Sequence, residues 1–147
     1  MKPLPHRYDV RLSGSTSGYA IASNGLAPLL RMAPPVEFDG PGDAWTPEHL
    51  LLAAVQACFL FTLRAVARAS KIELLHVDVG ASGTVDRTDG VTRFTEIVLC
   101  PTVTLAAGID RDRINRLLEK AERACLVSAS LSTPVRVRAA VVEREAA

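Results

Sequence analysis

The longest apolar stretch of the 147-residue chain covers residues 46–70. Thr46 is a preferred N-cap residue, and Pro47 suits the first position of a helix because no amide hydrogen is needed there. Only three strongly polar residues interrupt its central part, namely Gln56, Thr62 and Arg64. A helix that is apolar nearly all round is buried in a large core or spans a membrane. We therefore predict one long helix over residues 46–70, and the rest of the chain is organised around it.

The segments before this helix follow a strand pattern. Residues 7–12 alternate apolar and polar or charged side chains, and residues 19–23 read as the returning strand of a hairpin across a Gly/Ser-rich turn at 14–18. Asn24-Gly25 predicts a second turn, followed by a short apolar segment. The prolines and glycines of residues 34–42 predict an irregular loop that leads into the helix.

The segments after the helix predict a long β-hairpin. Leu75, Val77, Val79 and Ala81 alternate with polar or small residues, which predicts a half-buried strand. Thr88-Asp89-Gly90 is a turn signal, and residues 91–105 form the returning strand. On that strand Cys100 falls on the face opposite the main apolar set.

A second helix and a last strand complete the predicted order. Asp110 is a good N-cap, and an apolar stripe at helical spacing ends at Cys125, which places this cysteine in the helix's last turn facing the core. Residues 126–131 leave the helix, and alternating apolar residues from Val135 to Val141 form a closing strand. The order predicts an α+β fold in a single domain over residues 1–147.

Composition adds few functional constraints. The chain is 48% hydrophobic and 22% charged with a formal net charge of +1, so it offers no electrostatic reason to bind nucleic acid or an anionic membrane. The apolar stretch is just long enough to span a bilayer, but Arg64 lies inside it and the other segments are amphipathic. No signal-peptide pattern opens the chain, so we expect a cytoplasmic protein that does not span a membrane.

The three cysteines, Cys58, Cys100 and Cys125, are too widely spaced for a disulfide framework or a zinc site. The three histidines are scattered, and we expect no metal and no cofactor. Free cysteine is among the most buried residue types, so Cys58 and Cys125 have an ordinary explanation as structural thiols. Position alone does not decide between this explanation and a reactive pair, and Cys100 reads as structural or incidental.

Glu48 lies in the first turn of the long helix, where a carboxylate stabilises the helix dipole. It precedes Cys58 by ten residues, which separates the two by about 15 Å along the axis and roughly 80° around it. They cannot touch within one chain. If they share a site, two such helices must pack antiparallel in a homodimer.

Two motifs together resemble the osmotically inducible protein C / organic hydroperoxide resistance (OsmC/Ohr) family. The first is Pro-Glu-x-Leu at residues 47–50 followed by Ala-x-x-x-Cys at 54–58, and the second is Ala-x-x-x-Cys-x-x-Ser at 121–128. The resemblance covers almost the whole chain in element order. It implies an intertwined homodimer in which long central helices pack between curved antiparallel β-sheets.

The resemblance also implies a thiol peroxidase that needs no cofactor. Cys58 would attack an organic hydroperoxide, Cys125 would then close a disulfide with it, and a dithiol such as a lipoyl group would reduce that disulfide. An apolar entrance that includes Phe59 and Phe61 would favour alkyl or lipid hydroperoxides. A binding module for a small apolar or acyl ligand, with unreactive thiols, is the alternative.

The family pattern is incomplete at one point. Its peroxidases supply an arginine, held by the carboxylate equivalent to Glu48, from the first hairpin or from just before the Phe that precedes the Gly-rich loop. Here that hairpin tip has no arginine and Glu37 precedes Phe38, so Arg31 is the nearest candidate. Because Cys58 lies in the middle of a helix, we expect its pKa to be raised by burial unless a cation reaches it.

Overall fold

The computed structural model describes residues 11–14, 20–23, 25 and 27–144. Contacts within the chain divide it into two compact units, residues 1–51 and 52–147. Residues 7–10 of the predicted first strand and residues 15–18 of the hairpin tip lie outside the described residues. The α+β class is confirmed, since the described chain combines helices with two sheets.

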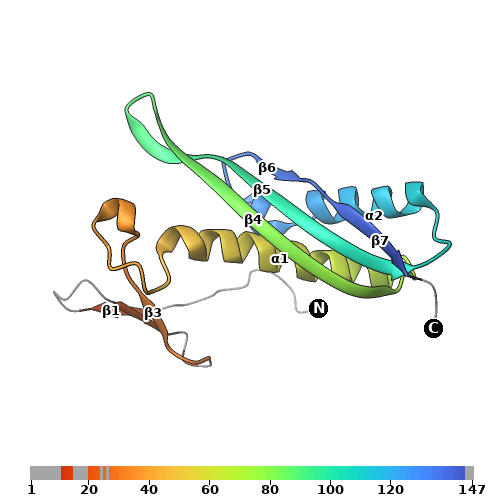
Figure 1. The fold of residues 1–147 in the computed structure, drawn as a ribbon, viewed down its shortest axis with the longest axis horizontal. Coiled ribbons are helices and arrows are strands. Elements are labelled where there is room, and N and C mark those ends of the chain that lie inside the picture. The colour runs from red at the N-terminus through yellow and green to blue at the C-terminus, as the bar shows by residue number, and fades with distance from the viewer. Residues whose placement is uncertain (1–10, 15–19, 24, 26, 145–147) are drawn as a thin grey trace. The chain divides into compact units, whose positions relative to one another are not determined.

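The elements follow one another as β1 (Arg11–Gly14), β2 (Ala20–Ser23), β3 (Leu30–Met32), the 3-10 helix η1 (Val36–Phe38), α1 (Pro47–Ala69), β4 (Leu74–Thr88), β5 (Val91–Ala106), α2 (Arg111–Arg123), α3 (Leu126–Ala129), β6 (Val135–Val137) and β7 (Ala140–Arg144) (Figure 1). The first unit ends within the first turns of α1, and the second unit holds the remainder of that helix.

The first unit is a three-stranded antiparallel sheet in the order β1-β2-β3. The predicted pairing of the first two strands is therefore confirmed over the residues described. The short apolar segment before residue 33 supplies the third strand.

The loop from Ala33 to Trp45 is closed at its ends. The Ala33 amide donates to the Trp45 carbonyl at 2.9 Å, and the Trp45 amide donates to the Arg31 carbonyl at 3.3 Å. The prediction that this segment has no regular structure was wrong for η1. There the Phe38 and Gly40 amides both donate to the Pro35 carbonyl, which bends the chain into one tight turn despite its prolines.

Gly40 is required by this turn. A Cβ atom at position 40 would lie 1.7 Å from the Pro34 carbonyl oxygen, whereas a Cβ at Gly80 would meet the Cys100 Cβ at an ordinary 3.8 Å. We expect Gly40→Ala to lower the free energy of unfolding by about 1–3 kcal/mol, because the backbone must shift to relieve the overlap. Urea denaturation of both variants measures this. Equal stabilities of Gly40→Ala and Gly80→Ala would contradict the close approach.

The N-terminus of α1 is capped as predicted: the Thr46 hydroxyl accepts a hydrogen bond from the His49 amide at 3.2 Å. One face of the helix is buried in the second unit and carries Val55, Phe59, Leu63, Val66 and Ala67. A second stripe is exposed in the single chain and carries Ala54, Ala57, Phe61 and Ala65. By length and composition α1 could cross a membrane, as many core helices could, yet only 28% of its most apolar stretch is buried in this chain.

The sheet of the second unit is mixed, not wholly antiparallel as expected. β5 pairs antiparallel with β4 on one side and parallel with both β6 and β7 on the other. The predicted single closing strand is interrupted at Arg138 and Ala139. These residues lie between the two pairing segments of β5, next to Pro101, which has no amide hydrogen to donate to a neighbouring strand.

The β4–β5 hairpin was predicted correctly except at its start. Its turn is Asp89-Gly90 with φ of 53° and 78°, the left-handed pair that a two-residue hairpin loop requires. A register shift between Leu74 and His76 makes Leu75 an extra residue. Leu75 is consequently half exposed, and Leu74 is the more buried of the two leucines.

The core of the second unit forms where α1 and α2 lie along the same face of this sheet (Figure 1). The predicted apolar face of β5 is confirmed as buried and consists of Ile97, Leu99, Val103 and Leu105. Asp110 accepts a hydrogen bond from the Asp112 amide and caps α2, also as predicted. The same packing fixes the middle of α1 against the end of α2.

Candidate active site

Two of the predicted site residues, Cys58 and Cys125, meet in the second unit. Cys58 lies in the middle of α1 and is partly exposed, while Cys125 is buried. The prediction that Cys125 lies in the last turn of the second helix was wrong. The helix α2 ends at Arg123, and residues 126–129 form the separate one-turn helix α3. The chain turns at Ala124 and Cys125, and this turn carries the following backbone amides towards α1.

Four groups surround the sulfur of Cys58. The Val127 amide donates a hydrogen bond to the Cys58 Sγ atom at 3.4 Å. The Cys125 thiol, the Thr62 hydroxyl and the Leu126 amide also lie near this sulfur and lower its pKa. Such donors stabilise the thiolate over the thiol.

The pKa of Cys58 lies below its ordinary value. Burial raises the pKa, but the hydrogen bonds from the Val127 amide, Cys125, Thr62 and the Leu126 amide together outweigh burial. The expectation that burial would raise this pKa unless a cation reached the thiol was therefore wrong. Polar groups from α3, which the sequence pattern did not place, lower it instead.

The pKa of Cys125 is shifted in the opposite direction. Burial raises it, hydrogen bonds from Ser128 oppose that effect, and the hydrogen bond and charge of Cys58 raise it further. The Ser128 hydroxyl donates to the Cys125 Sγ atom at 3.1 Å. The two thiols are thus distinguished by their pKa values, with that of Cys58 lowered and that of Cys125 raised.

The Thr62 hydroxyl offers a test of this division. Thr62→Val keeps the shape of the side chain and removes one donor to Cys58, so the pKa of Cys58 should rise. Alkylation of Cys58 followed against pH should then require a higher pH by a few tenths of a unit to about one unit. An unchanged pH profile would contradict the hydrogen bond.

Arg31 and Glu48 belong to the first unit and are not placed relative to the thiols. The Arg31 guanidinium bonds to the Asp43 carbonyl at 2.7 Å and to the Asp43 carboxylate at 3.2 Å. The Glu48 Oε2 atom is buried and has no hydrogen-bond partner among the residues that the structure describes. A buried carboxylate oxygen requires a donor, so Glu48 is suited to hold a cation. The catalytic roles of Arg31 and Glu48 stay predictions.

Cys100 lies apart from this pair. It is exposed on β5, opposite Gly80 of β4. Its predicted placement away from the apolar face of the strand is confirmed.

Phe59 does not form an entrance to the thiols. It lies on the inward face of α1 and is fully buried in the core. The prediction that Phe59 lines an entrance was therefore wrong. Phe61 is 63% exposed and Leu126 is 70% exposed. Phe61 lies one helix turn after Cys58, and Leu126 is the residue whose backbone amide lowers the pKa of Cys58.

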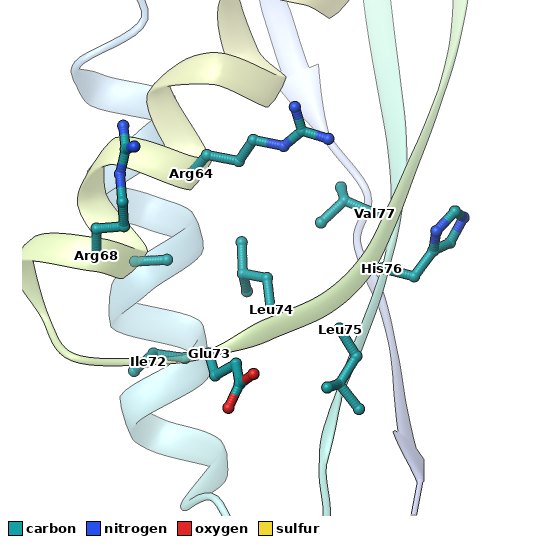
Figure 2. Close-up of a pocket in the computed structure, with 9 residues that line it drawn as sticks. Arg64, Arg68, Ile72, Glu73, Leu74, Leu75, His76 and Val77 are labelled. Atoms are coloured by element: carbon teal, nitrogen blue, oxygen red, sulfur yellow. The ribbon is translucent and has the colours of Figure 1, made fainter.

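The second unit contains two cavities whose positions can be compared with that of the thiols. One of about 230 Å³ is lined by Ser128 together with Phe59 and Leu99. A larger one of about 430 Å³ lies between the end of α1 and the start of β4 and is lined by no cysteine. Figure 2 shows Arg64 reaching from α1 across this cavity above Leu74, with Arg68 one turn further along the helix. The nucleophiles therefore lie outside the larger cavity.

Comparisons with known proteins identify the family of this chain. Residues 40–140 match the family model described as OsmC-like protein. The uncharacterized protein YmaD of Bacillus subtilis is 31% identical over 107 residues, which cover 71% of each chain.

Solved structures share the fold over nearly the whole chain. An OsmC-like protein of unknown function from Vibrio cholerae has a TM-score of 0.84 at 14% identity and covers 92% of this chain and 99% of its own. An organic hydroperoxide resistance protein, OsmC, from Legionella pneumophila has a TM-score of 0.74 at 26% identity and covers 95% of this chain and 99% of its own. With both cysteines inside the matched region, the chain belongs to the OsmC-like protein family.

Proposed function

We propose that this protein is a thiol peroxidase that reduces organic hydroperoxides to alcohols. The observation that carries the proposal is that the start of α3 brings Cys58 and Cys125 together, where the Val127 amide donates to Cys58 and the Ser128 hydroxyl to Cys125, and the pKa is lowered at Cys58 and raised at Cys125. A purely structural pair of thiols would not require pKa values that are shifted in opposite directions. The family and the name of the Legionella neighbour support a redox role of the peroxidase type.

The first step uses Cys58. Its thiolate attacks the outer oxygen of the hydroperoxide, a sulfur–oxygen bond forms, and the oxygen–oxygen bond breaks. The alkoxide takes a proton and leaves as the alcohol, and Cys58 is left as the sulfenic acid. The amides of Leu126 and Val127 serve this step by lowering the pKa of the Cys58 thiol.

The second step uses Cys125. Its thiol attacks the Cys58 sulfur, a disulfide forms, and the hydroxyl group leaves as water with the proton from Cys125. An external dithiol of the lipoyl type then reduces the disulfide and is itself oxidised to a disulfide. This cycle suits the reducing cytoplasm, where paired cysteines are commonly catalytic.

The substrate class follows from the side chains beside Cys58. Phe61 and Leu126 are exposed apolar side chains next to a partly exposed thiol. Such surroundings favour an alkyl or lipid hydroperoxide over hydrogen peroxide, because the apolar part of the substrate gains by leaving water.

We also propose that the protein is a homodimer. The exposed stripe of α1 carries the apolar residues Ala54, Ala57, Phe61 and Ala65, with Arg64 and Arg68 towards its far end, and it is uncovered in the single chain. A second copy packed on this stripe would bury it. In this proposal Glu48, with its buried unpaired oxygen, binds the cation that completes the site, and Arg31 is the candidate for that cation.

Thiol titration tests the peroxidase directly. Fully reduced protein mixed with one equivalent of cumene hydroperoxide should lose two of its three thiols per chain and yield cumyl alcohol. Peptide mapping should find the disulfide between Cys58 and Cys125. Unchanged thiol content with retained affinity for the organic group would favour the binding module instead.

A further inference from the structure

We propose that Ser128 is a positioning residue for disulfide closure, in which its hydroxyl holds the Cys125 sulfur ready to attack oxidised Cys58. This inference rests on the proposed peroxidase and adds to it a residue that acts on the second step alone. It is carried by the contact between the Ser128 hydroxyl and the Cys125 Sγ atom at 3.1 Å.

The two serines at α3 have different hydrogen-bond acceptors. Ser128 donates to the sulfur of Cys125, which immediately precedes the helix. Ser130 donates to the Leu126 carbonyl at 2.8 Å, an ordinary contact of a serine with the preceding turn. The two hydroxyls therefore lie close together, one in α3 and one at its C-cap, but of these two only that of Ser128 reaches the thiol pair.

The contact of Ser128 continues towards Cys58. The Ser128 hydroxyl donates to the Cys125 Sγ atom, and Cys125 lies near Cys58 and lowers the pKa of that thiol. In this proposal, the Ser128 contact orients the Cys125 thiol so that its hydrogen is directed at Cys58. When Cys58 carries a hydroxyl group, the same hydrogen is directed at the leaving group and departs with it as water.

The electrostatic surroundings agree with this role. The pKa of Cys125 is raised by burial and by Cys58, and Ser128 is the side chain that opposes both. The charged side chains that line the cavity beside Ser128 are Glu122 and Arg123 at the end of α2. The strands β5 and β6 contribute only apolar side chains to that cavity. Among these groups, Ser128 alone donates a side-chain hydrogen bond to the Cys125 sulfur.

Ser128→Ala should separate the two steps of the reaction. Stopped-flow mixing with cumene hydroperoxide should show oxidation of Cys58 at nearly the wild-type rate, since the donors to Cys58 are kept. Disulfide closure should be about tenfold slower at neutral pH, and its pH profile should move to higher pH, because a donor to the Cys125 sulfur is lost. The sulfenic acid should accumulate and be trapped by dimedone.

Two further variants exclude a merely structural effect. Ser128→Thr keeps a hydroxyl at the same position and should restore most of the closure rate. Ser130→Ala removes the hydroxyl at the C-cap of the same helix and should leave both steps unchanged. Closure by Ser128→Ala at the wild-type rate across the pH range would overturn the inference, as would equal slowing by Ser130→Ala.

A second measurement keeps the inference separate from the proposed function. In protein with Cys58→Ser and Cys100→Ser, Cys125 is the remaining thiol, and its ionisation can be followed by the ultraviolet absorbance of the thiolate. Adding Ser128→Ala should raise the pKa of Cys125 even if the wild-type protein consumes no hydroperoxide. An unchanged pKa would refute the role of Ser128, whereas unreactive wild-type thiols would refute only the peroxidase.

Discussion

Cys58→Ser is expected to abolish hydroperoxide reduction, with a loss of at least about a thousandfold, because the hydroxyl of serine is not ionised at neutral pH. The other thiols cannot replace it. Cys125 has a raised pKa and is buried, and Cys100 is exposed on β5 without a partner thiol among the described residues. Coupled oxidation of a dithiol in the presence of cumene hydroperoxide measures the loss.

Cys125→Ser should behave differently, because it removes the second step and spares the first. The variant should consume about one hydroperoxide per chain and then stop with Cys58 as the sulfenic acid. Mass spectrometry with dimedone identifies that product. Cys100→Ser is the matched control and should stay within a few-fold of the wild type. Equal residual turnover in the Cys58 and Cys125 variants would contradict the assigned roles.

The fold was predictable where one physical signal determined each element. The apolar length and the Thr46 cap determined α1, the Asp89-Gly90 turn determined the long hairpin, and Asp110 determined the start of α2. Errors arose where two signals competed. Pro101 lies within the strand pattern of β5 but has no amide hydrogen, and the chain that pairs with β5 is interrupted beside it. The predicted closing strand is therefore two strands, β6 and β7.

The candidate site was predictable in its cysteines but not in the groups that activate them. The two sequence motifs identified Cys58 and Cys125. The spacing of apolar residues, however, predicted a second helix that extends to Cys125, whereas the structure has a turn there. That turn presents the backbone amides of Leu126 and Val127, and backbone donors leave no side-chain signature in a sequence. The serine three residues after Cys125 was the one available signal, since serine at such spacing commonly bonds back to the start of a turn.

The apolar stripe of α1 gives the second large prediction. Val55 faces the core of a single chain and is fully buried, so a charge there would destabilise the protein in any oligomeric state. Phe61 is 63% exposed and lies on the opposite stripe, where a second copy would cover it. Burial of this stripe stabilises the pair by roughly 25 cal/mol for each Å² of apolar surface removed from water.

Phe61→Asp should therefore break the homodimer while leaving the core contacts of the single chain intact. Sedimentation at micromolar concentration should show the wild type as a dimer and the variant as a monomer. Val142→Asp is the control, because Val142 is similarly apolar and exposed but lies on β7. The melting temperature of the wild type should rise with protein concentration, since folding and association are coupled. A folded and active wild-type monomer, or a Phe61→Asp variant that sediments as a dimer, would refute packing through this stripe.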